Sequence, residues 1–225
     1  MQSLISYFFL LTLKYWSKLF YTIQITWPST PINWDNTKLI LLLNHTTLYE
    51  FIFLGFLPNH FLRKLSKRMV APGADKTLNR PFVGIFFKLF SPGMISITRK
   101  RDDSWDNFLE SIYEDSIILI APEGRMKRKN GLDLYGNKMT VKSGVVDILN
   151  GLDKGEMVIA YSGGLHHVQV PGEGLPKLFK TVKLHLESLD IPSYKKMFNT
   201  TIGSEQWIQA VLADLQWRLE NKVPV

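Results

Sequence analysis

The sequence contains no cysteine among its 225 residues. Disulfide bonds, thiolate metal sites and cysteine nucleophiles are therefore excluded, and the composition fits a reducing compartment. The chain also lacks the glycine-rich patterns that bind dinucleotides or nucleotide phosphates, and it has no Gly-x-Ser-x-Gly elbow for a serine nucleophile. Any chemistry must therefore come from other side chains.

Long hydrophobic runs are also missing. Residues 4–13 are apolar apart from Ser6 and Thr12, but Lys14 and Lys18 then interrupt the run. A spanning helix needs roughly 20 apolar residues, so this segment is too short for one. A signal peptide is not expected either, because no basic residue precedes the run and no small-residue cleavage site follows it.

The N-terminal segment nevertheless has the pattern of an amphipathic helix. On a helical projection one narrow side is polar, and the wide opposite side is apolar and rich in aromatic residues: Ser3, Ser6, Lys14 and Ser17 against Leu4, Phe8, Leu11, Tyr15 and Leu19. This pattern favours a helix lying in the headgroup region of a membrane, with Lys14 and Lys18 reaching towards phosphates. The alternative is a helix packed on the domain core. We expect residues 1–30 to form this membrane-associating segment, which the turn at Trp27 and Pro28 ends, and residues 31–225 to form one domain.

The chain is basic, with a formal net charge of +7 and a pI near 9.5. Such a balance favours anionic partners such as phosphate groups or acidic membranes, although a solvated lysine surface would give the same count. Aromatic residues are concentrated in apolar segments rather than interleaved with basic ones, which argues against nucleic acid as a partner.

Apolar runs and helical patterns alternate along the chain. We expect strands at residues 39–43, 69–71, 94–98, 116–121, 157–161 and 182–187, and helices at 48–65, 82–90, 104–114, 141–149 and 205–220. This alternation predicts an α/β fold with a mostly parallel central sheet flanked by helices.

A polar corner follows the strand at 39–43. His45 would lie in the loop after the strand, and Glu50 in the first turn of the next helix. Histidine is the natural general base near neutral pH, and a carboxylate can fix its tautomer. His45 must precede the helix, since five helical residues rotate by about 140° and would point the two side chains apart. Thr47 and Glu50 also form a capping box, so a purely structural role for Glu50 stays open.

Two further strand ends carry polar groups that fit an anionic ligand. Arg99 ends the strand at 94–98, and Glu123, Gly124 and Arg125 follow the strand at 116–121. Arginine binds phosphate through paired hydrogen bonds, and glycine lets the backbone approach a ligand. The alternatives are a solvated strand end and a flexible basic loop. The pair His166-His167 has no spaced partner, so we expect no metal site.

Four short motifs follow one another in the chain: NHTTLYE (44–50), GMISITR (93–99), APEGR (121–125) and MVIA (157–160). In order and spacing they resemble the N-H-x-x-x-x-D, G-x-x-F-I-x-R, F-P-E-G-T-R-S and V-I-P-V motifs of the glycerolipid acyltransferase family. The best-known members of that family are the 1-acyl-glycerol-3-phosphate acyltransferases. Lys142-Ser143-Gly144 also looks like the family's Lys-x-Gly helix start. The resemblance covers roughly residues 38–165.

The resemblance implies a membrane-associated enzyme whose active site faces the cytoplasm. It would transfer a fatty acyl group to the hydroxyl of a lysophospholipid, from acyl-CoA or an acyl carrier protein, without another cofactor. His45 would be the general base, oriented by Glu50, while Arg99 and the segment Glu123, Gly124 and Arg125 would hold the acceptor phosphate.

The chain departs from the family motifs at several positions. Glu50 replaces the usual aspartate, Arg125 stands where the family has threonine, and the fourth motif lacks its proline. The position of the family's arginine is therefore open between Arg125 and Arg128. A different acceptor, or an anionic-lipid-binding protein without activity, remains the alternative.

Overall fold

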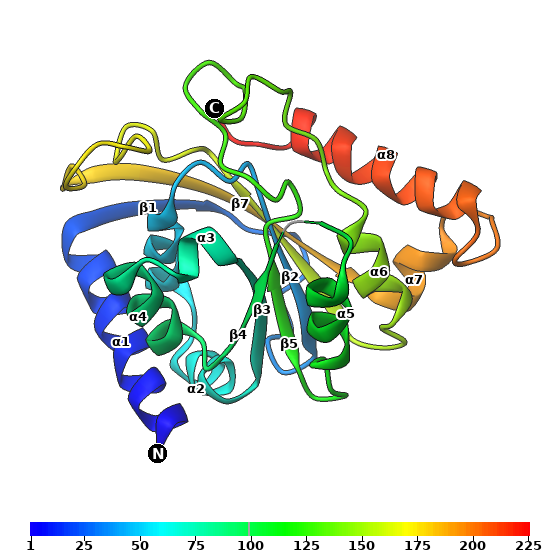
Figure 1. The fold of residues 1–225 in the computed structure, drawn as a ribbon, viewed down its shortest axis with the longest axis horizontal. Helices are drawn as coiled ribbons and strands as arrows, with labels where there is room; N and C mark the ends of the chain where they lie inside the picture. Colours follow the sequence, from blue (N-terminus) through cyan, green and yellow to red (C-terminus); the bar gives the residue numbers. More distant parts are fainter. Residues whose placement is uncertain (99) are drawn as a thin grey trace.

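The computed structural model describes residues 1–98 and 100–225 (Figure 1). The strands are β1 (Tyr21–Thr26), β2 (Thr37–Leu43), β3 (Met69–Ala74), β4 (Gly93–Ile97), β5 (Ile117–Ile120), β6 (Glu156–Ser162) and β7 (Lys180–Asp190). The helices are α1 (Gln2–Phe20), the 3-10 helix η1 (Leu48–Phe56), α2 (Asn59–Arg68), α3 (Asp75–Leu78), α4 (Pro81–Phe90), α5 (Asp103–Glu110), α6 (Gly144–Asn150), α7 (Ile191–Lys196) and α8 (Glu205–Asn221).

The strands form one sheet of seven, in the order β1-β7-β6-β2-β5-β3-β4. Neighbouring strands are parallel except β6 and β7, so β1 and β7 run opposite to the other five. The predicted α/β fold with a mostly parallel central sheet is confirmed.

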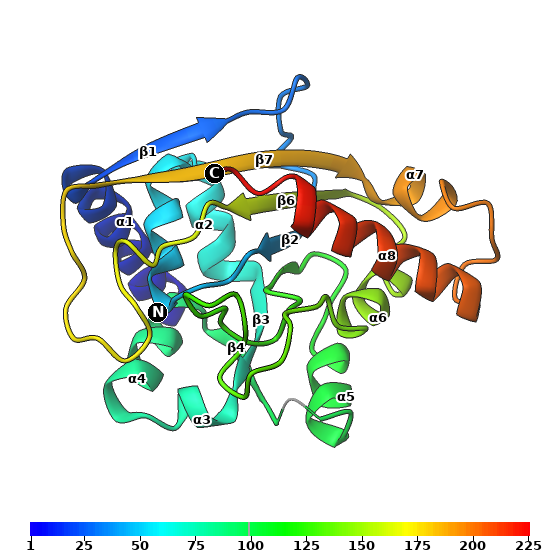
Figure 2. The same cartoon turned by 90° about the horizontal axis from the view of Figure 1, so that it is seen from above.

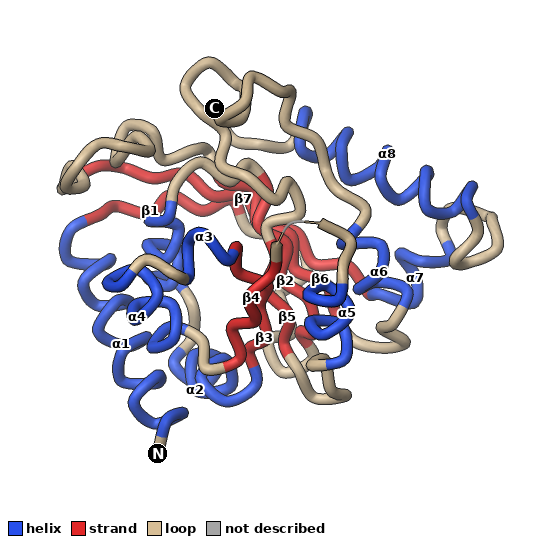
Figure 3. Tube along the Cα trace, viewed as in Figure 1, coloured by secondary structure: helices blue, strands red, loops and turns tan. Residues whose placement is uncertain are grey.

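Helices cover both faces of this sheet, as Figures 1 and 3 show. Alternation along β2 explains the two layers, because successive strand residues point to opposite faces. Leu39, Leu41 and Leu43 are fully buried against α5, α6 and α8. Ile40 and Leu42 face the other layer, which contains α1, η1, α2 and α4. Figure 2 shows the same two groups of helices from above.

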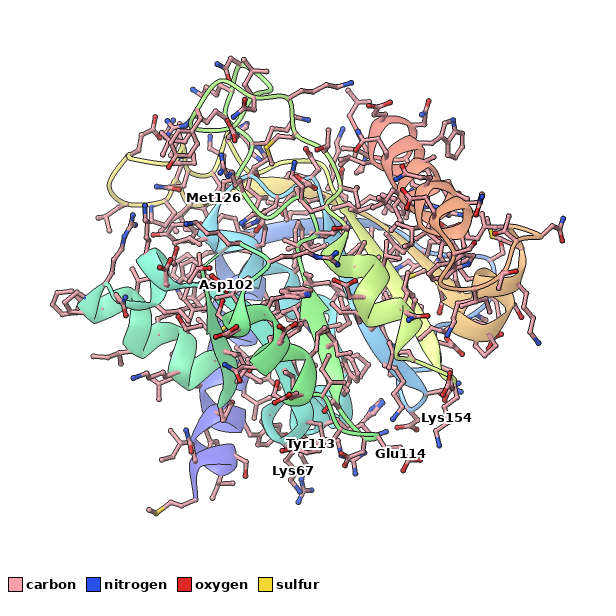
Figure 4. The ribbon with its side chains drawn as sticks, turned by 45° about the vertical axis from the view of Figure 1, so that its right-hand side comes forward. Lys67, Asp102, Tyr113, Glu114, Met126 and Lys154 are labelled. Carbon is pink, nitrogen blue, oxygen red and sulfur yellow. The ribbon has the colours of Figure 1, made fainter. Side chains whose placement is uncertain are left out.

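The parallel strands place their carboxyl ends at one edge of the sheet. Figure 4 shows the two opposite edges of the sheet: Met126, which follows β5, lies far from Lys67, Glu114 and Lys154. These three residues precede β3, β5 and β6, and Lys154 and Glu114 form an ion pair of 2.5 Å. The loops after β2, β5 and β6 therefore meet at the edge where Met126 lies.

The helices expected at 104–114 and 141–149 are shorter in the structure, at Asp103–Glu110 and Gly144–Asn150, and two other predicted helices differ more. The first was expected to reach Trp27, but it ends at Phe20, and residues 21–26 form β1, paired in parallel with β7. The sequence YTIQIT alternates and is rich in β-branched residues, which suit a strand. The helix expected at 48–65 is wrong as a single element, because η1 and α2 are separated at Leu57 and Pro58. The short helices α3 and α7 were not predicted, and the division at residue 30 stays a prediction.

Helix α1 packs on the protein through its polar side. Ser6, Leu10, Lys14 and Ser17 are its buried residues. The Nζ atom of Lys14 donates to the carbonyl oxygen of Leu57 at 2.7 Å and to Oδ1 of Asn59 at 2.6 Å. Burial, and secondarily the neighbouring Lys18, lower the pKa of Lys14. The expectation that Lys14 reaches towards lipid phosphates is therefore wrong.

Candidate active site

The loop after β2 carries His45 and has an unusual backbone conformation. Asn44 adopts a φ of 65°, a region that asparagine tolerates better than most residues. Its side-chain Nδ2 donates to the carbonyl oxygen of Ser162, the last residue of β6, at 2.8 Å. This bond ties the corner to the neighbouring strand and so fixes the base of the loop.

His45 and Glu50 form a direct pair. Nδ1 of His45 is hydrogen bonded to Oε2 of Glu50, while Oε1 of Glu50 accepts from the backbone N–H of Thr46 at 2.8 Å and more weakly from that of Thr47 at 3.5 Å. The capping box is also formed. Glu50 can therefore both orient His45 and cap the helix, since Oε2 contacts His45 and Oε1 accepts from the backbone at the helix start. His45 precedes η1, as the rotation argument required.

Glu123 is hydrogen bonded to the backbone of the His45 loop. Its side chain is 1% exposed, and its oxygens accept from the backbone N–H groups of Asn44 at 2.6 Å and His45 at 3.2 Å. Burial raises the pKa of Glu123 to about 7, against the opposing effects of His45 and the Asn44 N–H. The carboxylate thus holds the His45 loop, and its predicted contact with the substrate stays a prediction.

Lys127 adds a second connection between the two loops. Its backbone N–H donates to the carbonyl oxygen of His45 at 2.7 Å, and its Nζ donates to Oδ1 of Asn44 at 3.1 Å. The ring of His166 bonds the carbonyl oxygen of Lys127 at 2.7 Å. The structural reading of His166 thus fits its contacts, whereas the role of Lys127 was missed, because a basic loop gives no signal of backbone pairing.

Arg125 is already engaged by its own loop. Its guanidinium pairs with Asp133 at 2.5 Å and lies 4.5 Å from the ring centroid of Tyr135. The side chain is 37% exposed and lines the cavity described below. Gly124 before it has a φ of 70°, the left-handed conformation that favours glycine. The predicted ligand Arg99 lies outside the described residues.

A cavity of about 660 Å³ lies beside the His45–Glu50 pair. Ile40 and Leu42 of β2 line it, together with apolar side chains of η1, α2, β3 and α4. His45 follows the carboxyl end of β2, whereas Met69, another lining residue, begins the parallel strand β3. The cavity therefore extends along the strand direction, from the His45 loop towards the opposite edge of the sheet.

Cations gather around the polar part of this cavity. The basic lining residues are Lys100, Arg101, Arg125, Lys138 and Lys142. They come from the loops after β4 and β5 and from the segment before α6, all following strands that end at the same edge. The sequence predicted this convergence, although it did not single out Lys100, Arg101 or Lys138 as neighbours of His45.

The described part of the chain contains no group of three or more His, Asp or Glu side chains placed to hold a metal ion. Among residues 1–98 and 100–225 there is also no helix with the length and apolar character needed to cross a membrane.

We compared the sequence and the fold with those of known proteins. No curated protein matches the sequence. Among solved structures, the 1-acyl-sn-glycerophosphate (LPA) acyltransferase PlsC from Thermotoga maritima is similar, with a TM-score of 0.56 and 16% identity over 96% of this chain and 81% of that chain. This likeness shows a shared fold. The family model of the acyltransferases matches residues 25–160, more than half of the chain and all four motifs. The protein therefore belongs to the acyltransferase family of enzymes.

Proposed function

We propose that this acyltransferase moves a fatty acyl group from an acyl thioester to the hydroxyl of a lysophospholipid, with His45 as the general base. The single observation that carries the proposal is the His45–Glu50 pair beside one large cavity that is apolar along its length and cationic at its polar part. An acyl chain with a phosphate head has the matching distribution of apolar surface and negative charge.

The pair suits proton transfer from a hydroxyl. Glu50 holds Nδ1 of His45, so the other ring nitrogen, Nε2, takes the acceptor's proton, and the carboxylate stabilises the imidazolium that forms. The hydroxyl oxygen attacks the thioester carbonyl carbon, the C–S bond breaks, and the leaving thiolate recovers the proton from His45. No protein nucleophile takes part in this sequence.

The acceptor phosphate is assigned to the cationic part of the cavity. Arg99 and Arg125 are the proposed arginine ligands, and the left-handed Gly124 lets the backbone approach an anion. Glu123 contributes indirectly, by holding the backbone of the His45 loop. Because PlsC is by its name a 1-acyl-sn-glycerophosphate acyltransferase, 1-acyl-glycerol-3-phosphate is the first acceptor to test. Acyl-CoA and acyl carrier protein are the two donor carriers to compare.

A phospholipid membrane is the proposed partner of α1. Its polar side is buried, so its apolar side faces out: Leu4, Ile5, Phe8, Tyr15 and Leu19 are each at least 50% exposed. Exposed aromatic and aliphatic residues on one helix face suit insertion at the headgroup level, and the net charge of +7 favours anionic lipid. On this basis we propose that the protein is membrane-associated. The cytoplasmic orientation of its active site is proposed from the family resemblance alone.

The test is a thiol-release assay with each donor and a panel of lysophospholipid acceptors, with the product identified by mass. We expect His45→Ala to lower turnover by about 10²–10⁴-fold, the usual contribution of a general base, while the melting temperature stays close to that of the wild type. His167→Ala is the matched control, because this exposed histidine bonds only the Thr181 carbonyl oxygen among the contacts of the described residues. Full activity of His45→Ala would reject the base assignment.

A further inference from the structure

Helix α4 has apolar side chains both towards the cavity and in solvent. Phe86, Phe87 and Phe90 line the cavity. Phe82 and Ile85 of the same helix are 89% and 58% exposed. A helix of a soluble domain normally has one apolar side facing the core and a polar side facing water. The cavity therefore accounts for the three phenylalanines that line it, whereas no contact within the described chain accounts for the exposed Phe82 and Ile85.

Helix α4 packs against α1. The rings of Phe9 and Phe86 lie 5.3 Å apart, and Oγ of Ser6 donates to the carbonyl oxygen of Phe90 at 3.3 Å. Both Figure 1 and Figure 2 show the two helices next to each other. Two neighbouring helices therefore each carry exposed apolar residues, such as Phe8 on α1 and Phe82 on α4.

Exposed cations lie on the same and the neighbouring helix. Lys76 on α3, Arg80 at the start of α4 and Lys88 near its end are all exposed. Lysine and arginine near exposed aromatic residues complement a bilayer with anionic head groups, which attract the cations while the aromatic rings enter the interface. A protein partner could bind the apolar residues without the cations. An anionic bilayer uses both, so the combination favours lipid as the occupant.

We propose that α4 lies in the headgroup region of an anionic phospholipid bilayer and forms the wall between lipid and cavity, so that substrate acyl chains pass beside it. The path of the acyl chains rests on the proposed function. The insertion of α4 does not, because it follows from the exposed residues alone.

Insertion is tested by fluorescence, because the absence of native cysteine permits clean single-site labelling. Phe82→Cys on α4 and Trp217→Cys on α8, which is 54% exposed, each receive an environment-sensitive NBD probe. With vesicles of phosphatidylcholine and phosphatidylglycerol, we expect a blue shift and quenching by doxyl-labelled lipids at position 82 and neither effect at 217. Equal signals at both positions, or no change at 82, would overturn the insertion.

The passage of acyl chains is tested by turnover. The double variant Phe82→Asp and Ile85→Asp should lose about tenfold or more in activity on a long-chain acceptor embedded in vesicles, a loss that corresponds to about 1.4 kcal/mol. Its activity on a short-chain, monomeric acceptor should stay near that of the wild type. The control Trp217→Asp should change neither. Equal loss on both acceptors, or no loss on either, contradicts the passage. A wild type inactive on both acceptors would instead reject the proposed function, while the fluorescence result would still decide the insertion.

Discussion

The buried carboxyl of Glu123 predicts an unusual pH dependence of stability. Burial raises its pKa from 4.5 to about 7, although His45 and the backbone N–H groups of Asn44 and His45 oppose the rise. Below about pH 4.5 the group is protonated in both the folded and the unfolded chain. Between these values the folded chain keeps a proton that the unfolded chain has released, so the free energy of unfolding contributed by Glu123 falls as the pH rises. Above about pH 7 both states are ionised, and the loss is complete.

The size of this effect follows from the two pKa values. Each pKa unit corresponds to about 1.36 kcal/mol, so a rise from 4.5 to about 7 corresponds to a loss of about 3 kcal/mol. Glu123→Gln supplies the reference, because the amide cannot ionise and its oxygen can still accept from the Asn44 N–H. The difference in the free energy of unfolding, wild type minus variant, should therefore fall by about 3 kcal/mol between about pH 4.5 and about pH 7.5.

Urea unfolding in half-unit pH steps measures this difference. Glu220→Gln is the control, because Gln216 and Lys138 lower the pKa of the exposed Glu220. The stability that Glu220 contributes is present above about pH 4.5 and is lost only as the pH falls through its lower folded value, so its difference curve should be level in the window where that of Glu123 falls. A level or rising curve for Glu123 would refute the assignment of its raised pKa to burial.

Three further substitutions test other parts of the structure. Glu50→Gln keeps an oxygen for the helix start but removes the charge beside His45, so turnover should fall by about 10²-fold or more with little change in the melting temperature. Gly84→Ala would place a methyl group 2.1 Å from the carbonyl oxygen of Leu78, so the free energy of unfolding in urea should fall by about 1–3 kcal/mol. Arg218→Met would leave Asp214 without its 9% exposed cation and Glu187 with Lys222 as its remaining ion-pair partner among the described residues, and urea unfolding should show a loss of about 3–5 kcal/mol.

Much of the fold was readable because strong local patterns agree with it. The apolar run at 39–43 is long and bulky enough to identify the central strand β2. The polar residues that follow it indicate a loop. Among the described residues, His45 after β2, Lys100 and Arg101 after β4, and Glu123 to Arg125 after β5 then line one cavity, because parallel strands share one edge, which is a rule of topology rather than of local sequence. The sequence also indicated that His45 precedes its helix, because helical rotation rules out the alternative.

Other features depended on tertiary contacts that leave no local signal. The apolar side of α1 was recognised, but the burial of Lys14 was not, because a lysine finds a carbonyl partner only once η1 and α2 are placed. Residues 21–26 have a local strand pattern, but they directly follow the apolar helix, and their pairing with β7, some 160 residues later, is not visible in the sequence. The role of Glu123 was missed for the same reason, since its partners lie on a distant loop.

The position of Glu123 changes how the family-like motif at residues 121–125 must be understood. A carboxylate beside an expected phosphate site would repel the ligand if it faced the cavity. Glu123 is among the residues that line the cavity, but it is only 1% exposed, and its oxygens accept from the N–H groups of Asn44 and His45, which reduces that repulsion. The motif therefore joins two tasks in adjacent residues: the glutamate fixes the histidine loop, and Arg125 lines the cavity. The hydrogen bonds of Glu123 and of the Lys127 backbone N–H therefore tie the loop that carries His45 to the loop that carries Arg125.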